Sequence, residues 1–142
     1  MAAKELNVFV DNRPGRLRSV AEVLSENKIN VRTMTLQDHG QYGLMKLIVN
    51  DPDKAYRALS DKGFACALKD ILAVILKDKP GSFLKLADLL FKHNVNVLDA
   101  YGFVIESTKS AVFCVEVKDL PSIRSILQKE GFEVMDDDLY KF

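Results

Sequence analysis

The feature of the sequence that most constrains the fold is an internal repeat. The pair Pro14-Gly15 recurs as Pro80-Gly81, a shift of 66 residues (80 − 14). At this shift the apolar residues on both sides of the two pairs align, and the run 29–31 falls on the run 95–97 with a central asparagine in each. A register that is kept over a whole unit indicates a duplication, so we expect two copies of one small domain.

Each copy carries a hydrophobic pattern typical of the order strand, helix, strand, strand, helix, strand. Period-two alternation predicts strands, and apolar residues that recur every three or four positions predict helices. In the first copy these patterns place strands at 6–10, 29–36, 44–49 and 64–67, with helices beginning at 17 and 52. In the second copy they place strands at 71–76, 95–106, 110–118 and 132–135, with helices at 82–92 and 122–129. The order βαββαβ is that of a ferredoxin-like unit, in which two helices cover one face of a four-stranded antiparallel sheet.

The predicted fold is therefore α+β, with two ferredoxin-like units at residues 1–69 and 70–142. Only Lys69 and Asp70 separate the two copies. A connection this short is no flexible linker, so we expect the two units to pack closely, side by side.

Composition and charge exclude several classes of function. Twenty basic and twenty acidic residues cancel in a chain of 142 residues, so no basic field is present to hold a nucleic-acid backbone. The longest apolar run, 71–76, is far too short to span a bilayer. Residues 1–5 lack the apolar core of a signal peptide, so we expect a cytoplasmic protein. Cys66 and Cys114 have no Cys or His at metal-ligand spacing, so we expect buried reduced thiols, no metal site and no cofactor.

The Pro-Gly loop of each copy is the candidate binding element. The pair Pro14-Gly15 leads from a strand into a helix whose first N–H groups have no partner within the helix, which makes an anion site for a carboxylate. Glycine also lets a ligand approach the backbone closely. The alternative is a tight turn that binds nothing. Arg13 and Arg16 could clamp a carboxylate or remain solvated loop charges, and the second copy has Lys79 and Ser82 in their places.

Sequence motifs at these loops point to one known family. The order βαββαβ occurs with Asp-Asn-Arg-Pro-Gly at 11–15 after the first strand and with Asn-Lys-Ile-Asn-Val at 27–31 at the start of the second. Together with the duplication, these motifs resemble the ACT domain, a small-molecule sensor that most often binds amino acids. ACT domains are usually attached to metabolic enzymes such as phosphoglycerate dehydrogenase or aspartate kinase. The resemblance implies that the two units pair through their second strands into one eight-stranded antiparallel sheet with helices on one face.

The resemblance also implies a set of ligand-binding residues at the seam between two repeats. In ACT domains the loop after the first strand meets the pairing edge of the neighbouring domain there. The implied loop residues are Asn12, Arg13, Pro14, Gly15, Arg16 and Leu17 in the first copy and Asp78, Lys79, Pro80, Gly81, Ser82 and Phe83 in the second. The implied edge residues are Asn30, Val31, Asn96 and Val97.

The two implied sites differ in chemistry. Asn12 and Asn30 match the residue types of serine-binding dehydrogenase domains, and an amide can donate to a carboxylate while its carbonyl accepts from an ammonium. Asp78 takes the place of Asn12 in the second copy, where it can accept from an ammonium but repels a carboxylate. We therefore expect the better site to use Asn12, with Asn96 from the facing edge as its partner.

Two hypotheses of function follow from the resemblance. The first is an amino-acid-binding regulatory protein without catalytic activity, which acts through a regulated enzyme or through its own homodimer. A homodimer is expected because the helices leave one sheet face uncovered. The alternative is a ligand-free adaptor that acts only through protein contacts. Asp78 favours the adaptor, as do Val10 and Leu76, which stand where serine-binding domains have histidine.

Enzymes and other binding proteins built on the same fold fit the sequence less well. Ferredoxin-like acylphosphatases need a glycine-rich loop that cradles phosphate, and the first loop has one glycine and one proline. Copper chaperones need Cys-x-x-Cys in that loop, which contains no cysteine. RNA-binding relatives need a platform of exposed aromatic side chains on the middle strands, and Phe9 with Phe113 alone does not make one.

Overall fold

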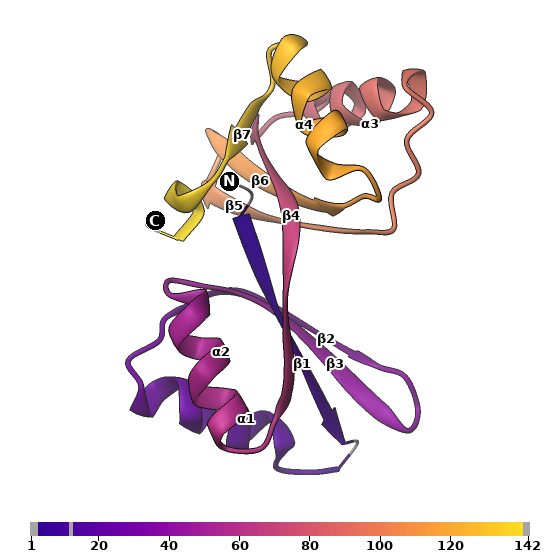
Figure 1. The fold of residues 1–142 in the computed structure, drawn as a ribbon. Helices are drawn as coiled ribbons and strands as arrows, with labels where there is room; N and C mark the ends of the chain where they lie inside the picture. Colours follow the sequence, from indigo (N-terminus) through magenta and orange to yellow (C-terminus); the bar gives the residue numbers. More distant parts are fainter. Residues whose placement is uncertain (1–2, 12, 141–142) are drawn as a thin grey trace. The chain divides into compact units, whose positions relative to one another are not determined.

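A computed structural model describes residues 3–11 and 13–140, and its internal contacts divide the chain into two compact units. The first unit comprises Lys4–Lys69, and the second comprises Asp70–Tyr140 together with Ala3. Each unit has the order of elements that the repeat predicts (Figure 1). Among the described residues, no helix is both long and apolar enough to cross a bilayer.

The first unit is a four-stranded antiparallel arrangement with two helices. Its elements are β1 (Ala3–Asp11), α1 (Arg16–Glu26), β2 (Val31–Asp38), β3 (Tyr42–Val49), α2 (Pro52–Asp61) and the start of β4 (Ala65–Lys77). The strand order is β2-β3-β1-β4. Val10 and Asp38 both align with Gly43, so this glycine lies between β1 and β2 at one end of the sheet.

The second unit repeats this arrangement. Its elements after β4 are α3 (Ser82–Lys92), β5 (Asp99–Glu106), β6 (Ser110–Glu116), α4 (Leu120–Lys129), β7 (Glu133–Met135) and the 3-10 helix η1 (Asp137–Tyr140). β4 pairs with both β6 and β7, and β5 pairs with β6. The prediction of an α+β protein with two ferredoxin-like units is therefore confirmed.

The described residues form seven strands, because β4 belongs to both units. Separate strands were expected at 64–67 and 71–76, with Lys69 and Asp70 as a junction, but one strand runs through both segments. The segment 65–77 contains no glycine or proline that would end a strand. A polar pair is tolerated in a strand where it is exposed, and both residues are exposed.

Each unit has its own core between the helices and one face of the strands. In the first unit, Leu6, Val8 and Val10 alternate along β1 and pack in one cluster with side chains from α1 and α2. In the second unit, Leu72, Val74 and Leu76 do the same in β4. The inward face is therefore set by the period-two pattern, and both helices of a unit cover that face (Figure 1).

Candidate functional site

The two Pro-Gly loops have the same backbone conformation. Gly15 has φ of 91° and Gly81 has φ of 90°, the left-handed region that costs glycine nothing and other L-residues about 1 kcal/mol. Each glycine is the residue that precedes its helix, and its carbonyl accepts the first helical hydrogen bond, from Ser19 at 2.9 Å or Lys85 at 3.1 Å. The loop therefore directs the strand abruptly into α1 or α3.

The helices that follow these loops begin without a side-chain cap in the described part of the chain. The other two helices are capped, because the side chain of Asp51 accepts from the Lys54 N–H in α2 and that of Asp119 accepts from the Ser122 N–H in α4. Uncapped N–H groups carry the positive end of the helix dipole and favour an anion. Among the described α-helices, α1 and α3, which follow the Pro-Gly loops, are therefore the ones whose N-termini can bind an anion.

A pocket of about 220 Å³ lies at the first of these helix starts, within the first unit. Its lining combines the loop with the ends of β2 and β3. The lining residues are Val10, Asp11, Arg13, Pro14, Gly15, Arg16, Leu17, Leu36, Asp38, Gly43 and Met45. Five of the six loop residues predicted for the first copy lie here, whereas the sixth, Asn12, lies outside the described residues.

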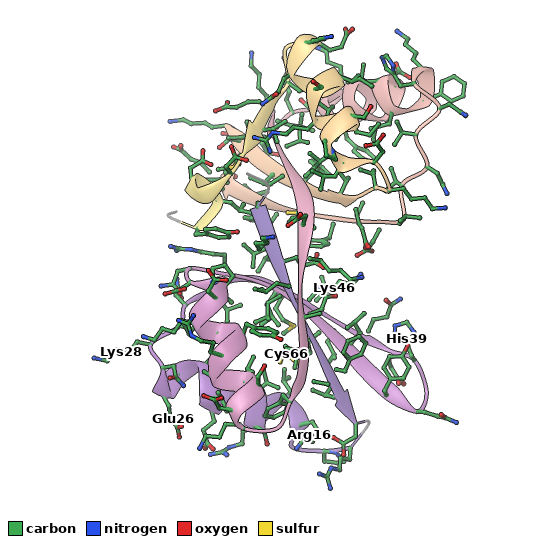
Figure 2. The ribbon with its side chains drawn as sticks, in the orientation of Figure 1. Arg16, Glu26, Lys28, His39, Lys46 and Cys66 are labelled. Carbon is green, nitrogen blue, oxygen red and sulfur yellow. The ribbon has the colours of Figure 1, made fainter. Side chains whose placement is uncertain are left out.

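Asp11 forms ion pairs with both arginines of the first loop. Its Oδ2 lies 2.5 Å from Arg13 Nε and its Oδ1 lies 2.5 Å from Arg16 Nε. The Arg16 guanidinium also lies over the Phe64 ring, 4.8 Å from the ring centroid. Figure 2 shows Arg16 at the start of α1. Both cations therefore already have a carboxylate partner in the pocket.

Gly43 closes the floor of the first pocket. A Cβ atom at this position would lie 3.2 Å from Val10 Cγ2 and 3.4 Å from Leu36 Cδ1. The Val10 and Leu36 side chains thus pack closely against the Gly43 backbone and leave little room for a Cβ atom. The absence of a side chain at residue 43 keeps the space beneath α1 open.

The second loop opens into a larger cavity of about 470 Å³ within the second unit. Its lining comes from the loop, the start of α3, the β5–β6 hairpin and the turn between α4 and β7. The lining residues are Ile75, Leu76, Lys77, Lys79, Ser82, Lys85, Lys109, Ser110, Glu130, Gly131, Phe132 and Glu133. Of the predicted loop residues, Lys79 and Ser82 line it, whereas Phe83 stacks on Phe113 with ring centroids 5.2 Å apart.

Asp78 is held by the neighbouring hairpin. Its Oδ2 accepts from the backbone N–H of Thr108 at 2.7 Å, and its own N–H donates to the Lys109 carbonyl at 3.1 Å. Thr108 has φ of 66°, so the carboxylate anchors a turn residue in the left-handed region. Asp78, which replaces the asparagine expected for a ligand site, therefore links the loop to the hairpin.

The predicted edge residues lie far along the hairpin from the loop of their own unit. Asn30 lies beside Asn50, since its N–H donates to Asn50 Oδ1 at 2.9 Å and its carbonyl accepts from the Asn50 N–H at 3.1 Å. Val31 pairs with Val49, whereas the loop lies at the Gly43 end of β3. Val31 instead lines a separate apolar pocket of about 370 Å³ between α1 and the β2–β3 hairpin.

The second unit repeats this separation. Leu98, which directly follows Asn96 and Val97, donates its N–H to the Glu116 carbonyl, whereas Lys77, the last residue of β4 before the loop, pairs with Ser110. Asn96 is exposed, and Val97 is about one-third exposed. Among the described residues, neither unit brings an edge asparagine to its own loop. Asn12 lies outside them, and its predicted pairing with Asn96 across repeats stays a prediction.

Sequence reasoning missed the lining residues that lie outside the loops. In the first pocket these include Asp38 and Gly43, which reach the loop through strand register. In the second cavity they include Lys85, Glu130 and Glu133. The alignment of Asp11 with Lys77 at the 66-residue shift was the available indication that the two loops differ in charge.

Both units match one known family. The sequence fits the family model described as an ACT domain pair over residues 1–142. The chain belongs to this family. A crystal structure of a protein from Bacteroides thetaiotaomicron is 30% identical to this ACT domain pair, with a TM-score of 0.93 over 100% of this chain and 98% of that one. No curated protein matches the chain.

Two regulatory subunits share the fold of this ACT domain pair. The regulatory subunit of aspartate kinase from Thermus flavus has 15% identity and a TM-score of 0.61, with 90% of each chain covered. The ligand-free form of the Thermus thermophilus subunit has 17% identity and a TM-score of 0.61, with 89% of this chain and 91% of that one covered. The predicted ACT resemblance is confirmed, and within its 142 residues the chain is a pair of regulatory-type domains without a separate catalytic domain.

Proposed function

We propose that this ACT domain pair is an amino-acid-binding regulatory protein whose first-unit pocket holds the ligand. One observation carries the proposal. The uncapped start of α1 faces a pocket of about 220 Å³ that also contains the carboxylate of Asp38. An α-amino acid carries one negative and one positive group, and this pocket offers a partner for each.

The ligand carboxylate would bind at the start of α1. The N–H groups of Arg16, Leu17 and Arg18 precede the first helical hydrogen bond, which Ser19 donates to Gly15. They have no partner within the helix, and the helix dipole adds a partial positive charge at the same place. Arg13 and Arg16 add further positive charge, moderated by their pairing with Asp11.

The ligand ammonium would bind at Asp38. The Oδ1 atom of this residue accepts from the Gly40 N–H at 2.8 Å, which fixes the carboxylate at the end of β2. An ionised carboxylate has about four acceptor positions, so the group can also accept from an ammonium. Asp11 is less suited to this task because two guanidinium groups already contact it.

The pocket suits a small amino acid. Its volume is below the range of roughly 300–1,000 Å³ that is typical of pockets for drug-sized ligands. Val10, Leu36 and Met45 make the rest of the lining apolar. We therefore expect a ligand whose side chain is short.

The regulatory output would pass through a partner. The ACT domain pair would act on metabolism through a regulated enzyme or through its own assembly, and we expect a homodimer. Light scattering at micromolar concentration tests the dimer, and a monomer at every concentration would contradict it.

Calorimetric titration with the twenty amino acids tests the proposed ligand class. We expect one or a few small amino acids to bind, and Asp38→Asn to weaken binding about tenfold or more because a hydrogen bond to a charged group is lost. Asp61→Asn is the matched control, since Asp61 lies at the end of α2 and does not line the pocket. If no amino acid binds, the ligand-free adaptor replaces this proposal.

A further inference from the structure

The cavity in the second unit differs from the first pocket in the charge of its lining. Lys77 stands at the position equivalent to Asp11, which pairs with both arginines of the first loop. Lys77 lines the cavity together with Lys79 and Lys85. The duplication thus kept the loop conformation and changed an acidic position to a basic one.

These three lysines form no ion pair in the part of the chain that the structure describes. Within the described residues, ion pairs link Arg13 and Arg16 to Asp11, but no ion pair involves Lys77, Lys79 or Lys85. The fourth cavity lysine, Lys109, is paired with Glu106 at 3.0 Å. Asp78, which lies between Lys77 and Lys79 in sequence, accepts from the Thr108 N–H. Three lysines without an ion pair among the described residues therefore line one cavity.

Hydroxyl and backbone donors complete the basic side of the cavity. Ser82, the first residue of α3, is buried and lines the cavity, and Ser110 lines it from the start of β6. The N–H groups at the start of α3 lack a side-chain cap. Lysines, serine hydroxyls and an uncapped helix start are the groups with which proteins bind phosphate.

The other part of the cavity lining is acidic. Glu130 and Glu133, which flank the turn between α4 and β7, line the same cavity. Their carboxylates repel a second phosphate but accept hydrogen bonds from hydroxyl or ammonium groups. The cavity therefore favours a ligand with one phosphate and a remainder that carries donors, and about 470 Å³ accommodates such a molecule.

We propose that the second unit binds a small phosphomonoester whose other end carries hydroxyl or ammonium groups. The phosphate lies among Lys77, Lys79, Lys85 and the start of α3, and the donors face Glu130 and Glu133. This site is separate from the amino-acid pocket of the first unit, and the two can fail independently.

Calorimetry with four probes tests the site: inorganic phosphate, O-phosphoserine, glycerol 3-phosphate and unphosphorylated serine. Serine can bind the first unit, so each titration is repeated on Asp38→Asn. We expect both phosphomonoesters to bind more tightly than inorganic phosphate, and their affinity to fall as salt is raised. No binding of either phosphomonoester, or binding no tighter than that of inorganic phosphate, would overturn the proposal.

Lysine substitutions locate the binding. Lys77→Gln, Lys79→Gln and Lys85→Gln are each expected to weaken phosphomonoester binding about three- to tenfold, and the triple variant to abolish it. Lys92→Gln is the matched control. It removes one lysine charge from the last turn of α3, the helix that carries Lys85, and Lys92 does not line the cavity. Equal loss in Lys92→Gln would show unspecific attraction and contradict the site. All four lysines are exposed, so thermal melts of the variants should match the parent protein.

Discussion

Asp78 and Thr108 are joined by a hydrogen bond of 2.7 Å between Asp78 Oδ2 and the Thr108 backbone N–H. The bond connects the second Pro-Gly loop to the β5–β6 hairpin, across 30 residues of sequence. Asp78 stands where the first copy has Asn12, a position that family resemblance assigns to ligand binding. In the second unit the residue at this position connects the loop to the hairpin by hydrogen bonds.

Substitution of Asp78 should therefore lower stability. Asp78→Ala leaves the Thr108 N–H without its acceptor, and we expect the free energy of unfolding to fall by about 1–2 kcal/mol. Asp78→Asn should cost less because its carbonyl oxygen can still accept. Urea unfolding measures both, with Asp88→Ala on the exposed face of α3 as control. An unchanged midpoint in Asp78→Ala would contradict the structural role.

A side chain at either of the left-handed loop glycines should lower the stability of the fold. A Cβ atom at Gly15 or Gly81 would have no heavy atom within 4 Å, so any cost of substitution comes from the backbone. We expect Gly15→Ala and Gly81→Ala each to lower the free energy of unfolding by about 1 kcal/mol. Asparagine adopts this conformation more readily, so Gly81→Asn should cost less than Gly81→Ala in the same denaturation experiment. An equal or larger cost for asparagine would show that something other than φ is responsible.

Burial should make Cys66 a poor thiolate. Desolvation raises the pKa of the Cys66 thiol, a hydrogen bond with Ser60 partly opposes it, and Sγ also lies 3.4 Å from the Phe64 carbonyl. The unfolded chain therefore loses this proton at a lower pH than the folded chain. The resulting stability is complete below the ordinary thiol pKa and is lost as the pH rises toward the raised value.

The comparison of the parent protein with Cys66→Ala isolates this effect. Cys114 is present in both, so the difference in their unfolding free energy should be constant below the ordinary thiol pKa. Above it, the parent should lose stability faster than the variant. Parallel pH profiles of the two proteins would show that the pKa of Cys66 is not raised.

The sequence pattern predicts the fold well because the fold is local and repeated. Alternation such as Leu6, Val8, Val10 fixes the inward face of a strand, and the 66-residue shift confirms it in the second copy. A break in the strand was expected at Lys69 and Asp70 because a polar pair interrupts the apolar pattern, but one strand runs through both residues. The continuity of β4 depends on its place between β1 and β6, which no local pattern specifies.

The candidate site could be predicted only in part. The loop conformation follows from Pro-Gly, which is a local signal. Asp38 and Gly43 reach the loop through the register of β2 on β3, which no local pattern specifies. The bond from Asp78 to Thr108 likewise joins residues distant in sequence.

Backbone amide NMR during titration with the amino acid that binds tests the central claim most directly. If the ligand carboxylate lies at the start of α1, the N–H resonances of Arg16, Leu17 and Arg18 should shift most, and their equivalents at the start of α3 should stay in place. Saturable binding that leaves these three resonances unchanged would contradict the account.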